Sequence, residues 1–397
     1  MIKVLHIVTA FPRSDAEDSM TPWLIATLQQ LERIGIKNTI FAPSYKGLGN
    51  QTVMGLDVRR FRYFPRCCED LTHDVTTPAK LSQKPWYVFW VPFLLFFGRR
   101  AFSKLIRAEQ FDIVHIHWPL PMAFIGAPAF GKVPNLLHFY TAETAMARRY
   151  PIAKKFLRWA MKRTDEIIAI STHAMNLAKE AFDRPIKIVP YGSFFPEKPP
   201  EVFSPKADAK KKILFVGRIV ERKGVQYLIQ AMPGILKKID AELIIVGGGA
   251  PVPQLKTLAH ELGIEKNVLF TGIIKAKDKD RYYRESDVFV LPACYDKYGD
   301  TEGLGVVLLE ALSVGKPVVA SAVGGIVDIV INEKTGLLVP EKDPQALADA
   351  LVRILTDDHL YIRLAKDGYQ YALKNFSVSA VAENIKTIYE ALLMKSK

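Results

Sequence analysis

The sequence predicts an α/β protein made of two doubly wound domains that face each other across an inter-domain cleft. Three observations support this prediction. The chain has 397 residues, more than a single hydrophobic core usually serves. Apolar strand-like runs alternate with amphipathic helical stretches along its length, as in parallel sheets covered by helices. A proline-rich segment separates two such series, and ligands of open α/β sheets bind at the carboxyl ends of the strands, which places the expected site in the cleft.

The first domain is expected to span residues 1–195. Its first strand lies at the N-terminus, where Val and Ile dominate and no cleavage site of a secretory signal follows. The strands predicted here are Val4–Thr9, Asn38–Phe41, Ile113–His117, Asn135–Phe139, Glu166–Ile170 and Lys187–Val189. The predicted helices are Pro22–Ile34, Pro151–Arg163 and Thr172–Ala181.

A linker is expected at 196–212, because this segment is rich in proline and then in lysine. The second domain, 213–375, repeats the α/β plan. Its predicted strands are Lys212–Arg218, Leu243–Val246, Val268–Phe270, Val288–Leu291 and Pro317–Ala320. A C-terminal helix within 376–397 is expected to pack back toward the first domain.

The net charge of +13 is concentrated in the first half of the chain, where residues up to Pro190 carry 26 Lys and Arg against 15 Asp and Glu. No finger, RNP or basic-zipper motif accompanies this charge, so nucleic acid is not expected as a partner. An anionic membrane surface suits the charge better.

An apolar, aromatic-rich run from Lys84 to Gly98 is followed by Arg99, Arg100, Lys104 and Arg107. The run is too short to span a bilayer, and Pro92 interrupts it. Two interpretations of residues 84–107 remain open: a helix buried under the sheet, or an interfacial segment with its aromatic side chains in lipid and its cations at phosphates.

Three cysteines, Cys67, Cys68 and Cys294, give neither a disulfide framework nor a metal-binding spacing. A reducing cytoplasm is therefore expected, with peripheral attachment to the inner face of a membrane as an addition to it. No cofactor and no metal are predicted.

Two glutamates frame the segment that is most informative about function. Glu302 lies in a glycine-flanked turn, and Glu310 lies two turns into a predicted helix. Residues eight apart return to about the same helix face, about 12 Å apart. Because Gly303, Leu304, Gly305 and Val306 open that helix, their backbone N–H groups could approach an anion. A ligand that carries both an anion and hydroxyl groups, such as a nucleotide sugar, would suit this arrangement.

A cationic loop follows the first strand of the second domain. Arg218 and Lys223 stand five residues apart just before a helix, where a guanidinium and an ammonium could clamp a diphosphate. A solvated basic turn is the alternative.

These motifs together resemble the retaining glycosyltransferases of family four, which have the GT-B fold of two Rossmann-like domains. The resemblance covers nearly all of the C-terminal half in the right order. Its elements are Val216-Gly-Arg218 with Lys223-Gly224, Val246-Gly-Gly-Gly249, Val268-Leu-Phe-Thr-Gly272, Glu302 through Leu312, Gly315-Lys-Pro-Val-Val319, Gly324-Gly325 and Thr335-Gly-Leu-Leu-Val339.

The resemblance implies that Arg218 and Lys223 hold the donor diphosphate and that Glu310 accepts hydrogen bonds from the ribose. It also implies that Glu302 contacts the transferred sugar, that residues 303–306 supply backbone donors, and that Gly248 and Gly272 belong to the donor site. The cations would replace a metal, and the expected donor is a UDP-, GDP- or ADP-sugar. The acidic pair Asp278 and Asp280 is interpreted as part of a solvated helix.

The first half of the chain resembles the family less explicitly. His138 falls where the family places a histidine near the donor sugar, so it is a catalytic candidate. His115 and His117 face the same side of their strand and could form a metal pair, but the sequence indicates no third ligand. The loop Phe11–Thr21 lacks the glycine pair of many relatives, which puts its role in doubt.

The sequence therefore predicts a metal-independent retaining hexosyl-type transferase that uses a glycan or lipid-linked acceptor in polysaccharide or cell-envelope biosynthesis. Within the same fold, a nucleotide-sugar epimerase and a phosphorylase remain alternatives. A dinucleotide-dependent oxidoreductase lacks its G-x-G-x-x-G fingerprint after the first strand. A non-catalytic basic protein that binds membrane or nucleic acid would leave Glu302 and Glu310 unexplained.

Overall fold

The computed structural model describes residues 1–15, 20–74, 80–81, 83–196, 200, 203–204 and 210–395. Parts of the loop 11–21 and of the predicted linker 196–212 thus lie outside the described residues. The chain forms two compact units. The N-terminal unit comprises Met1–Gly192 and Val378–Lys397, and the C-terminal unit comprises Ser193–Ser377.

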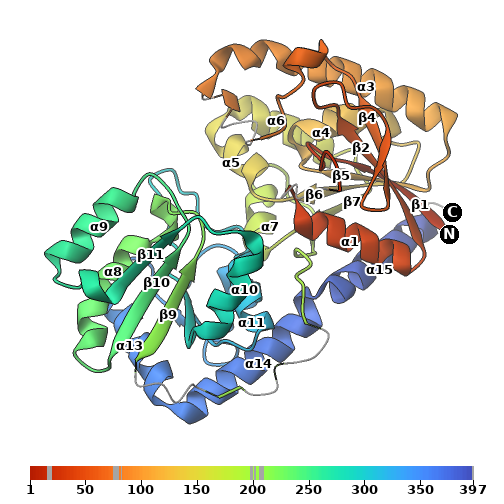
Figure 1. The fold of residues 1–397 in the computed structure, drawn as a ribbon. Helices are drawn as coiled ribbons and strands as arrows, with labels where there is room; N and C mark the ends of the chain where they lie inside the picture. The colour runs from red at the N-terminus through yellow and green to blue at the C-terminus, as the bar shows by residue number, and fades with distance from the viewer. Residues whose placement is uncertain are drawn as a thin grey trace. The chain divides into compact units, whose positions relative to one another are not determined.

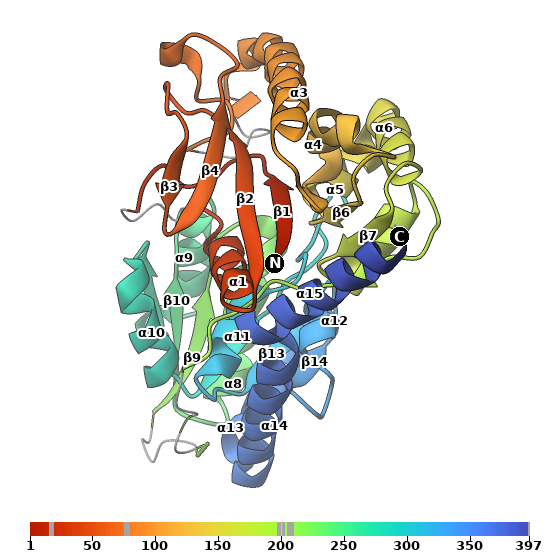
Figure 2. The same cartoon turned by 90° about the vertical axis from the view of Figure 1, so that its right-hand side faces the viewer.

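The N-terminal unit is built on an eight-stranded sheet with the order β3-β4-β2-β1-β5-β6-β7-β8. All pairings are parallel except that of β3 with β4. Figure 2 shows β3, β4, β2 and β1 side by side in this order. The bounds are β1 Ile2–Ile7, β2 Ile36–Pro43, β3 Gln51–Val53, β4 Leu56–Phe61, β5 Ile113–His117, β6 Asn135–Phe139, β7 Glu166–Ala169 and β8 Lys187–Ile188.

Helices cover this sheet. They are α1 Pro22–Arg33, α3 Val91–Ala108, α4 Pro119–Gly126, α5 Ala142–Arg149, α6 Pro151–Met161, α7 Thr172–Lys179 and α15 Val378–Lys395. Helix α1 begins at a proline, whose fixed φ suits the first helical position. Its buried leucines Leu24, Leu28 and Leu31 recur at helical spacing and form one apolar face.

The C-terminal helix α15 belongs to the core of the N-terminal unit. Its residues Val381, Ile385, Ile388 and Leu392 lie in one buried cluster with the apolar face of α1 and with strands of the sheet. Figure 1 shows α15, in blue, running beside α1, in red. The last helix in the sequence thus completes the first folded unit.

The C-terminal unit is built on a six-stranded parallel sheet with the order β11-β10-β9-β12-β13-β14. The bounds are β9 Lys211–Val216, β10 Ala241–Val246, β11 Val268–Gly272, β12 Val288–Leu291, β13 Val318–Ser321 and β14 Leu337–Val339. Its helices are α8 Val225–Leu236, α9 Val252–Glu261, α10 Ala276–Glu285, α11 Val306–Ser313, α12 Ile326–Ile329, α13 Pro344–Thr356 and α14 Asp358–Phe376.

The strand order places one topological switch point in each unit. In the N-terminal sheet β1 lies between β2 and β5, and in the C-terminal sheet β9 lies between β10 and β12. Ligands of doubly wound sheets bind beyond the carboxyl ends of strands at such a point. A ligand site in the C-terminal unit is therefore expected at the loops after β9 and β12.

The predicted strands match the observed ones closely, but sequence reasoning missed β3 and β4. These two strands form a hairpin on the edge of the N-terminal sheet. The segment Leu56–Phe61 contains an acid and two arginines, which obscured the alternation of apolar side chains. No described helix of the structure is long and apolar enough to cross a membrane.

The aromatic run of residues 84–98 forms a short 3-10 helix, η2 Pro85–Trp90, and the first turns of α3. One face of α3 packs on the unit through Leu94, Gly98 and Phe102. A side chain at Gly98 would collide with Ile125 and Phe61, so the helix lies tight against its neighbours there. The opposite face of α3 is exposed. The interpretation of this segment as a buried helix therefore holds for one face of α3 and not for the other.

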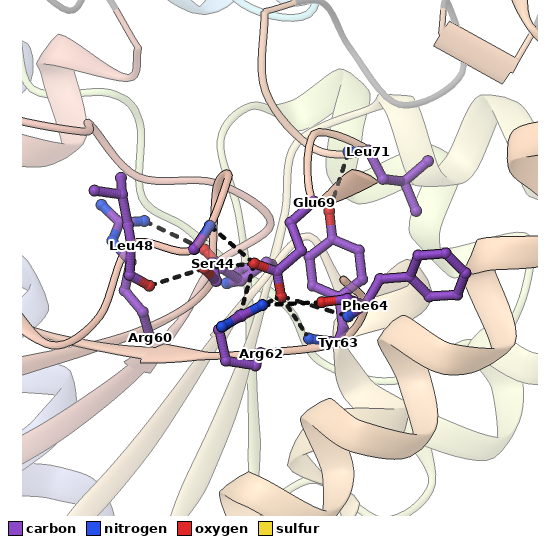
Figure 3. Close-up of polar contacts among 10 residues, drawn as sticks. Ser44, Leu48, Arg60, Arg62, Tyr63, Phe64, Glu69 and Leu71 are labelled. Atoms are coloured by element: carbon purple, nitrogen blue, oxygen red, sulfur yellow. Dashed lines mark hydrogen bonds and ion pairs between the residues drawn. The ribbon is translucent and has the colours of Figure 1, made fainter. Parts of the chain in front are cut away.

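A buried carboxylate, Glu69, ties together the chain that leads from β4 toward η2 (Figure 3). Its side chain is fully buried and forms an ion pair with Arg62 at 2.7 Å. It also accepts hydrogen bonds from the Ser44 hydroxyl and from the backbone N–H groups of Gly47 and Tyr63, each at 3.0 Å. Burial alone would raise the pKa of Glu69, but the hydrogen bonds from Arg62, Tyr63, Ser44 and Phe64 together lower it below its usual range.

Candidate donor site

The cationic loop after β9 is held in place by glycines. Gly224, the residue before α8, has φ +67°, and a Cβ there would lie 1.8 Å from the carbonyl oxygen of Pro292. Any side chain would therefore push this loop away from the end of β12. Lys223 is buried, whereas Arg218 is exposed, and among the described residues no carboxylate pairs with Arg218.

The glycine-rich turn after β10 packs directly on the same loop. A Cβ on Gly247 would lie 1.9 Å from the Gly217 carbonyl oxygen, and one on Gly249 would lie 1.8 Å from that of Ile219. The Ile219 N–H donates to the Gly248 carbonyl at 2.9 Å. Gly272, at the end of β11, has φ +73° and accepts a hydrogen bond from the Gly247 N–H. Gly248 thus lies against the loop that carries Arg218, and Gly272 holds the glycine-rich turn through Gly247.

Besides Asp300, which lies 3.7 Å from the Arg222 guanidinium, Glu302 is the carboxylate that meets the cationic loop. It forms an ion pair with Lys223 and lies 3.7 Å from an Arg222 guanidinium nitrogen. The side chains of Lys223 and Glu302 are only 11% and 14% exposed, so little water screens the pair. Arg222 also donates to the Thr301 carbonyl at 3.2 Å.

A glycine pair, Gly324 and Gly325, packs against the backbone of the turn that carries Glu302. A Cβ on Gly324 would lie 2.1 Å from the Glu302 carbonyl oxygen, and one on Gly325 would lie 2.1 Å from that of Gly303. The Gly325 N–H donates to the Glu302 carbonyl at 2.9 Å. The Gly-Gly motif seen in the sequence is therefore explained by close backbone packing.

Glu310 lies in a separate polar cluster. Its carboxylate accepts from the Lys279 ammonium at 2.6 Å and from the Tyr283 hydroxyl at 2.7 Å. Burial and the neighbouring Glu310 charge raise the pKa of Tyr283 well above its usual value, so this hydroxyl stays protonated and donates. Lys279 lies between Asp278 and Asp280, so the helix interpreted as merely solvated also contributes a cation to this cluster.

The prediction that helical periodicity places both glutamates on one face is wrong. Helix α11 begins at Val306, after Gly305 with φ +95°, and Glu302 lies in the loop before it. Glu302 and Glu310 are therefore positioned by different contacts. Each carboxylate meets its own set of cations or donors, and Gly303, Leu304, Gly305 and Val306 lie between them in the chain.

His138 belongs to the N-terminal unit, where it lies in a buried polar network. Its Nδ1 is 3.0 Å from the Tyr140 hydroxyl, which is also 2.5 Å from Nδ1 of His117. Burial lowers the pKa of His138 to about 3, so the imidazole is neutral at physiological pH. Its catalytic role stays a prediction. Because the residue is only 3% exposed, contact with a sugar would require neighbouring side chains to move.

The third histidine that the sequence did not indicate is His6. The parallel register sets it opposite His115, and its Nδ1 lies 3.1 Å from Nε2 of His117. The three rings His6, His115 and His117 form a buried group whose nitrogens lie within 4.8 Å of one another. The His115 and His117 rings are nearly parallel, 15° apart, so their in-plane lone pairs do not converge on one point. The geometry fits a hydrogen-bonded chain from His117 through His6 to Asn38, which accepts from His6 at 3.0 Å, better than a metal centre. His115 contacts the Tyr389 hydroxyl at 2.7 Å instead.

Sequence reasoning missed an aromatic cluster that follows the carboxyl ends of strands in the N-terminal unit. Trp118 directly follows β5, and its ring centroid lies 4.5 Å from that of Tyr140. Trp23 lies 4.2 Å from Tyr191 and 5.3 Å from Tyr140. Trp118, and Thr141 next to Tyr140 in the chain, have positive φ values of 51° and 101°, which is strain of the kind found at functional sites.

The loop after β1, which lacks the glycine pair of many relatives, has a side-chain anchor. Arg60, a buried residue of β4, donates to the backbone carbonyls of Phe11, Pro12 and Pro43. The role of the loop residues 16–19 falls outside the described residues.

Two α/β units on mainly parallel sheets, with cations and carboxylates gathered at the switch point of the second, define a GT-B protein. The sucrose-phosphate synthase of Thermosynechococcus elongatus has this fold and superposes with a TM-score of 0.75, at 22% identity over 100% of both chains. Residues 197–371 match the family model described as Glycosyl transferases group 1, and residues 23–192 match Glycosyltransferase Family 4. The chain belongs to this family of glycosyltransferases, which confirms the predicted fold class and resemblance.

Curated relatives agree with this assignment. The GDP-mannose-dependent alpha-(1-6)-phosphatidylinositol monomannoside mannosyltransferase of Mycolicibacterium smegmatis is 31% identical over 296 residues, which are 69% of this chain and 75% of that protein. An uncharacterised glycosyltransferase of Methanocaldococcus jannaschii is 35% identical over 187 residues. That match spans 46% of this chain and 45% of the relative, so it covers less than half of either protein.

Proposed function

We propose that the protein is a metal-independent retaining glycosyltransferase that moves a hexose-type sugar from a nucleotide-diphosphate sugar to a hydroxyl of a glycan or glycolipid. The observation that carries this proposal is the contact of Lys223 and Arg222 with Glu302 beside exposed Arg218, beyond the carboxyl ends of β9 and β12. Cations, a carboxylate and glycine-lined turns are what a diphosphate bonded to a sugar requires.

The Lys223–Glu302 pair suggests how the site changes when the donor arrives. Without a ligand, each group neutralises the other. A donor diphosphate would attract the Lys223 ammonium, together with the Arg218 guanidinium, through charge-assisted hydrogen bonds. Glu302 would then be free to accept hydrogen bonds from the hydroxyls of the sugar. These two cations would stabilise the charge that develops on the leaving diphosphate, which is the task of a metal ion in other transferases.

Retention follows in this proposal from attack on the face that the diphosphate leaves. The bond from the anomeric carbon to the phosphate oxygen breaks, and the acceptor oxygen bonds to the same face of that carbon. The acceptor proton passes to the departing phosphate oxygen. Glu302 contributes by holding the sugar, and no covalent enzyme intermediate is required.

The acceptor and the place of action are part of the proposal. The mycobacterial relative is named for acting on a phosphatidylinositol mannoside, which favours a lipid-linked acceptor in cell-envelope glycan synthesis. The free cysteines Cys67, Cys68 and Cys294 favour a reducing cytoplasm, and peripheral attachment to the inner membrane face would bring the enzyme to such an acceptor.

The stereochemistry of the product tests this function. The purified chain is incubated with α-linked UDP-, GDP- and ADP-sugars and candidate lipid and glycan acceptors, and the new linkage is identified by NMR. We expect an α-linked product, with turnover unchanged by a brief exposure to EDTA. A β-linked product would contradict the retaining mechanism. Conversion of the donor without acceptor would indicate an epimerase, and a strict requirement for free phosphate would indicate a phosphorylase.

Replacing Glu310 with Ala should weaken donor binding by about 10- to 100-fold, because hydrogen bonds from the ribose to a charged carboxylate would be lost. The measurement is a thermal-shift titration with the nucleotide sugar, since a ligand that binds only the folded state raises the melting temperature. Glu261→Ala, on an exposed position of α9, is the control and should bind as wild type does. Equal donor affinity in the Glu310 variant would show that the ribose assignment is wrong.

A further inference from the structure

The exposed face of η2 and α3 carries a concentration of aromatic side chains that is unusual for a water-facing surface. Trp86, Phe89 and Phe96 are 57%, 72% and 61% exposed, and Phe93 and Phe97 are exposed beside them. Single exposed apolar residues need no explanation, but a contiguous aromatic patch marks an interaction site. We call this set the aromatic patch.

Cations continue the same helical stripe. Phe93, Phe96, Arg100, Lys104 and Arg107 follow one another at spacings of three or four residues, so they lie on one face of α3. An open cavity of about 740 Å³ lies along the second half of the stripe, lined by Phe96 and Ser103 and by four cations, Arg99, Arg100, Lys104 and Arg107. We call these four the cationic cavity.

The charges of this cavity are not balanced within the unit. The sequence contains no acid between Asp74 and Glu109, although it has six Lys and Arg there. Arg99 is anchored, since it donates to the Phe124 carbonyl at 2.9 Å and stacks on the Phe124 ring. Among the described residues, no carboxylate pairs with Arg100, Lys104 or Arg107. An anionic partner would therefore meet three uncompensated cations.

We propose that this face, η2 with α3, docks the protein on an anionic phospholipid bilayer, with the aromatic patch entering the interfacial region and the cationic cavity receiving lipid phosphates. This inference rests on the proposed function only for its purpose, which is access to a lipid-linked acceptor. The docking itself follows from the surface.

The chemistry of the two halves favours a bilayer over other occupants. Trp and Phe side chains lie well at the boundary between headgroups and acyl chains, and Lys and Arg beside them reach phosphates. A nucleic acid would meet the cations but would leave the aromatic patch exposed to water. The rigid attachment of α3 through Leu94, Gly98 and Phe102 keeps both halves of the stripe on one fixed surface.

The test is cosedimentation of the full chain with large unilamellar vesicles of phosphatidylcholine alone or with 30% phosphatidylglycerol. We expect binding to the anionic vesicles at least 10-fold tighter than to neutral ones, and weaker binding in high salt. The triple variant Arg100→Ala/Lys104→Ala/Arg107→Ala should lose about 100-fold in affinity for the anionic vesicles. The variant Trp86→Ser/Phe89→Ser/Phe96→Ser should bind the anionic vesicles at least 10-fold more weakly than wild type, and its residual binding should keep the same dependence on salt.

Lys237→Ala/Lys256→Ala/Lys366→Ala is the matched control, because it removes the same charge from exposed positions of the C-terminal unit. It should bind anionic vesicles as wild type does. Equal loss in this control, or no binding by wild type, would overturn the proposal. A vesicle-free dimer that the serine variant converts to monomer would also overturn it, since the patch would then serve a second copy of the chain.

Donor binding and transfer to a water-soluble acceptor are measured without vesicles for the same variants. Both should be unchanged, since η2 and α3 lie outside the proposed donor site. Normal transfer with no vesicle binding would refute only the docking surface, whereas vesicle binding without any transfer would refute only the proposed function.

Discussion

Replacing Lys223 with Met should lower kcat by about 100- to 1,000-fold, because one charged group that stabilises the leaving diphosphate would be missing. The methionine keeps most of the length of the side chain, and Glu302 retains Arg222 at 3.7 Å, so the loop should stay in place. Steady-state kinetics with saturating acceptor measure the effect, and circular dichroism checks the fold.

Two controls sharpen this experiment. Lys238→Met removes an exposed lysine that pairs with Asp349, and it should leave kcat within twofold of wild type. Glu302→Gln leaves Lys223 without its carboxylate partner. This variant should also lower kcat if, as proposed, Lys223 binds the donor diphosphate and Glu302 then accepts hydrogen bonds from the sugar. A Lys223→Met enzyme with kcat within threefold of wild type would remove the basis for assigning Lys223 to the diphosphate.

Replacing Glu69 with Ala should destabilise the N-terminal unit by roughly 3 to 5 kcal/mol, because Arg62 and the backbone N–H groups of Gly47 and Tyr63 would lose their common acceptor. For a unit of this size the loss corresponds to a fall in melting temperature of roughly 10 °C. Differential scanning calorimetry resolves the transition of each unit. Glu109→Ala is the control, since its 3.3 Å ion pair with Arg59 is partly exposed, whereas Glu69 is fully buried.

The pH dependence of this effect has a definite sign. The folded-state pKa of Glu69 lies below its unfolded value, so its contribution to stability is fully present above the unfolded pKa. It is lost as the pH falls through the lowered folded-state pKa. The difference in melting temperature between wild type and Glu69→Ala should therefore shrink in acid. A difference that is below 2 °C at pH 7, or that grows in acid, would contradict this role of Glu69.

The order of strands and helices could be predicted from the sequence because it follows from the local spacing of apolar residues. Apolar runs such as Ile113–His117 and Val288–Leu291 recur as strands with the same bounds in the structure. The hairpin of β3 and β4 was missed, since β3 has only three residues and in β4 the buried position after Leu56 and Val58 is taken by Arg60.

The residues of the donor loop could likewise be proposed from motifs, but their partners could not. Lys279 and Tyr283 contact Glu310 from a helix about 30 positions earlier in the chain. No local sequence pattern predicts that contact. His6 meets His117 only through the parallel pairing of β1 with β5, a register that the sequence does not express.

The sequence by itself determined the alternation of strands and helices, the family of the chain and the residues proposed to bind the donor, because periodicity and short motifs are properties of neighbouring residues. The tertiary structure decided what each of these residues touches. It paired Glu302 with Lys223, placed Glu310 in a cluster of its own, buried His138 and exposed the aromatic face of α3. Such outcomes depend on how elements distant in the sequence pack together and on which face of each element is exposed to water. Both are determined by the packing of the whole core and not by neighbouring residues.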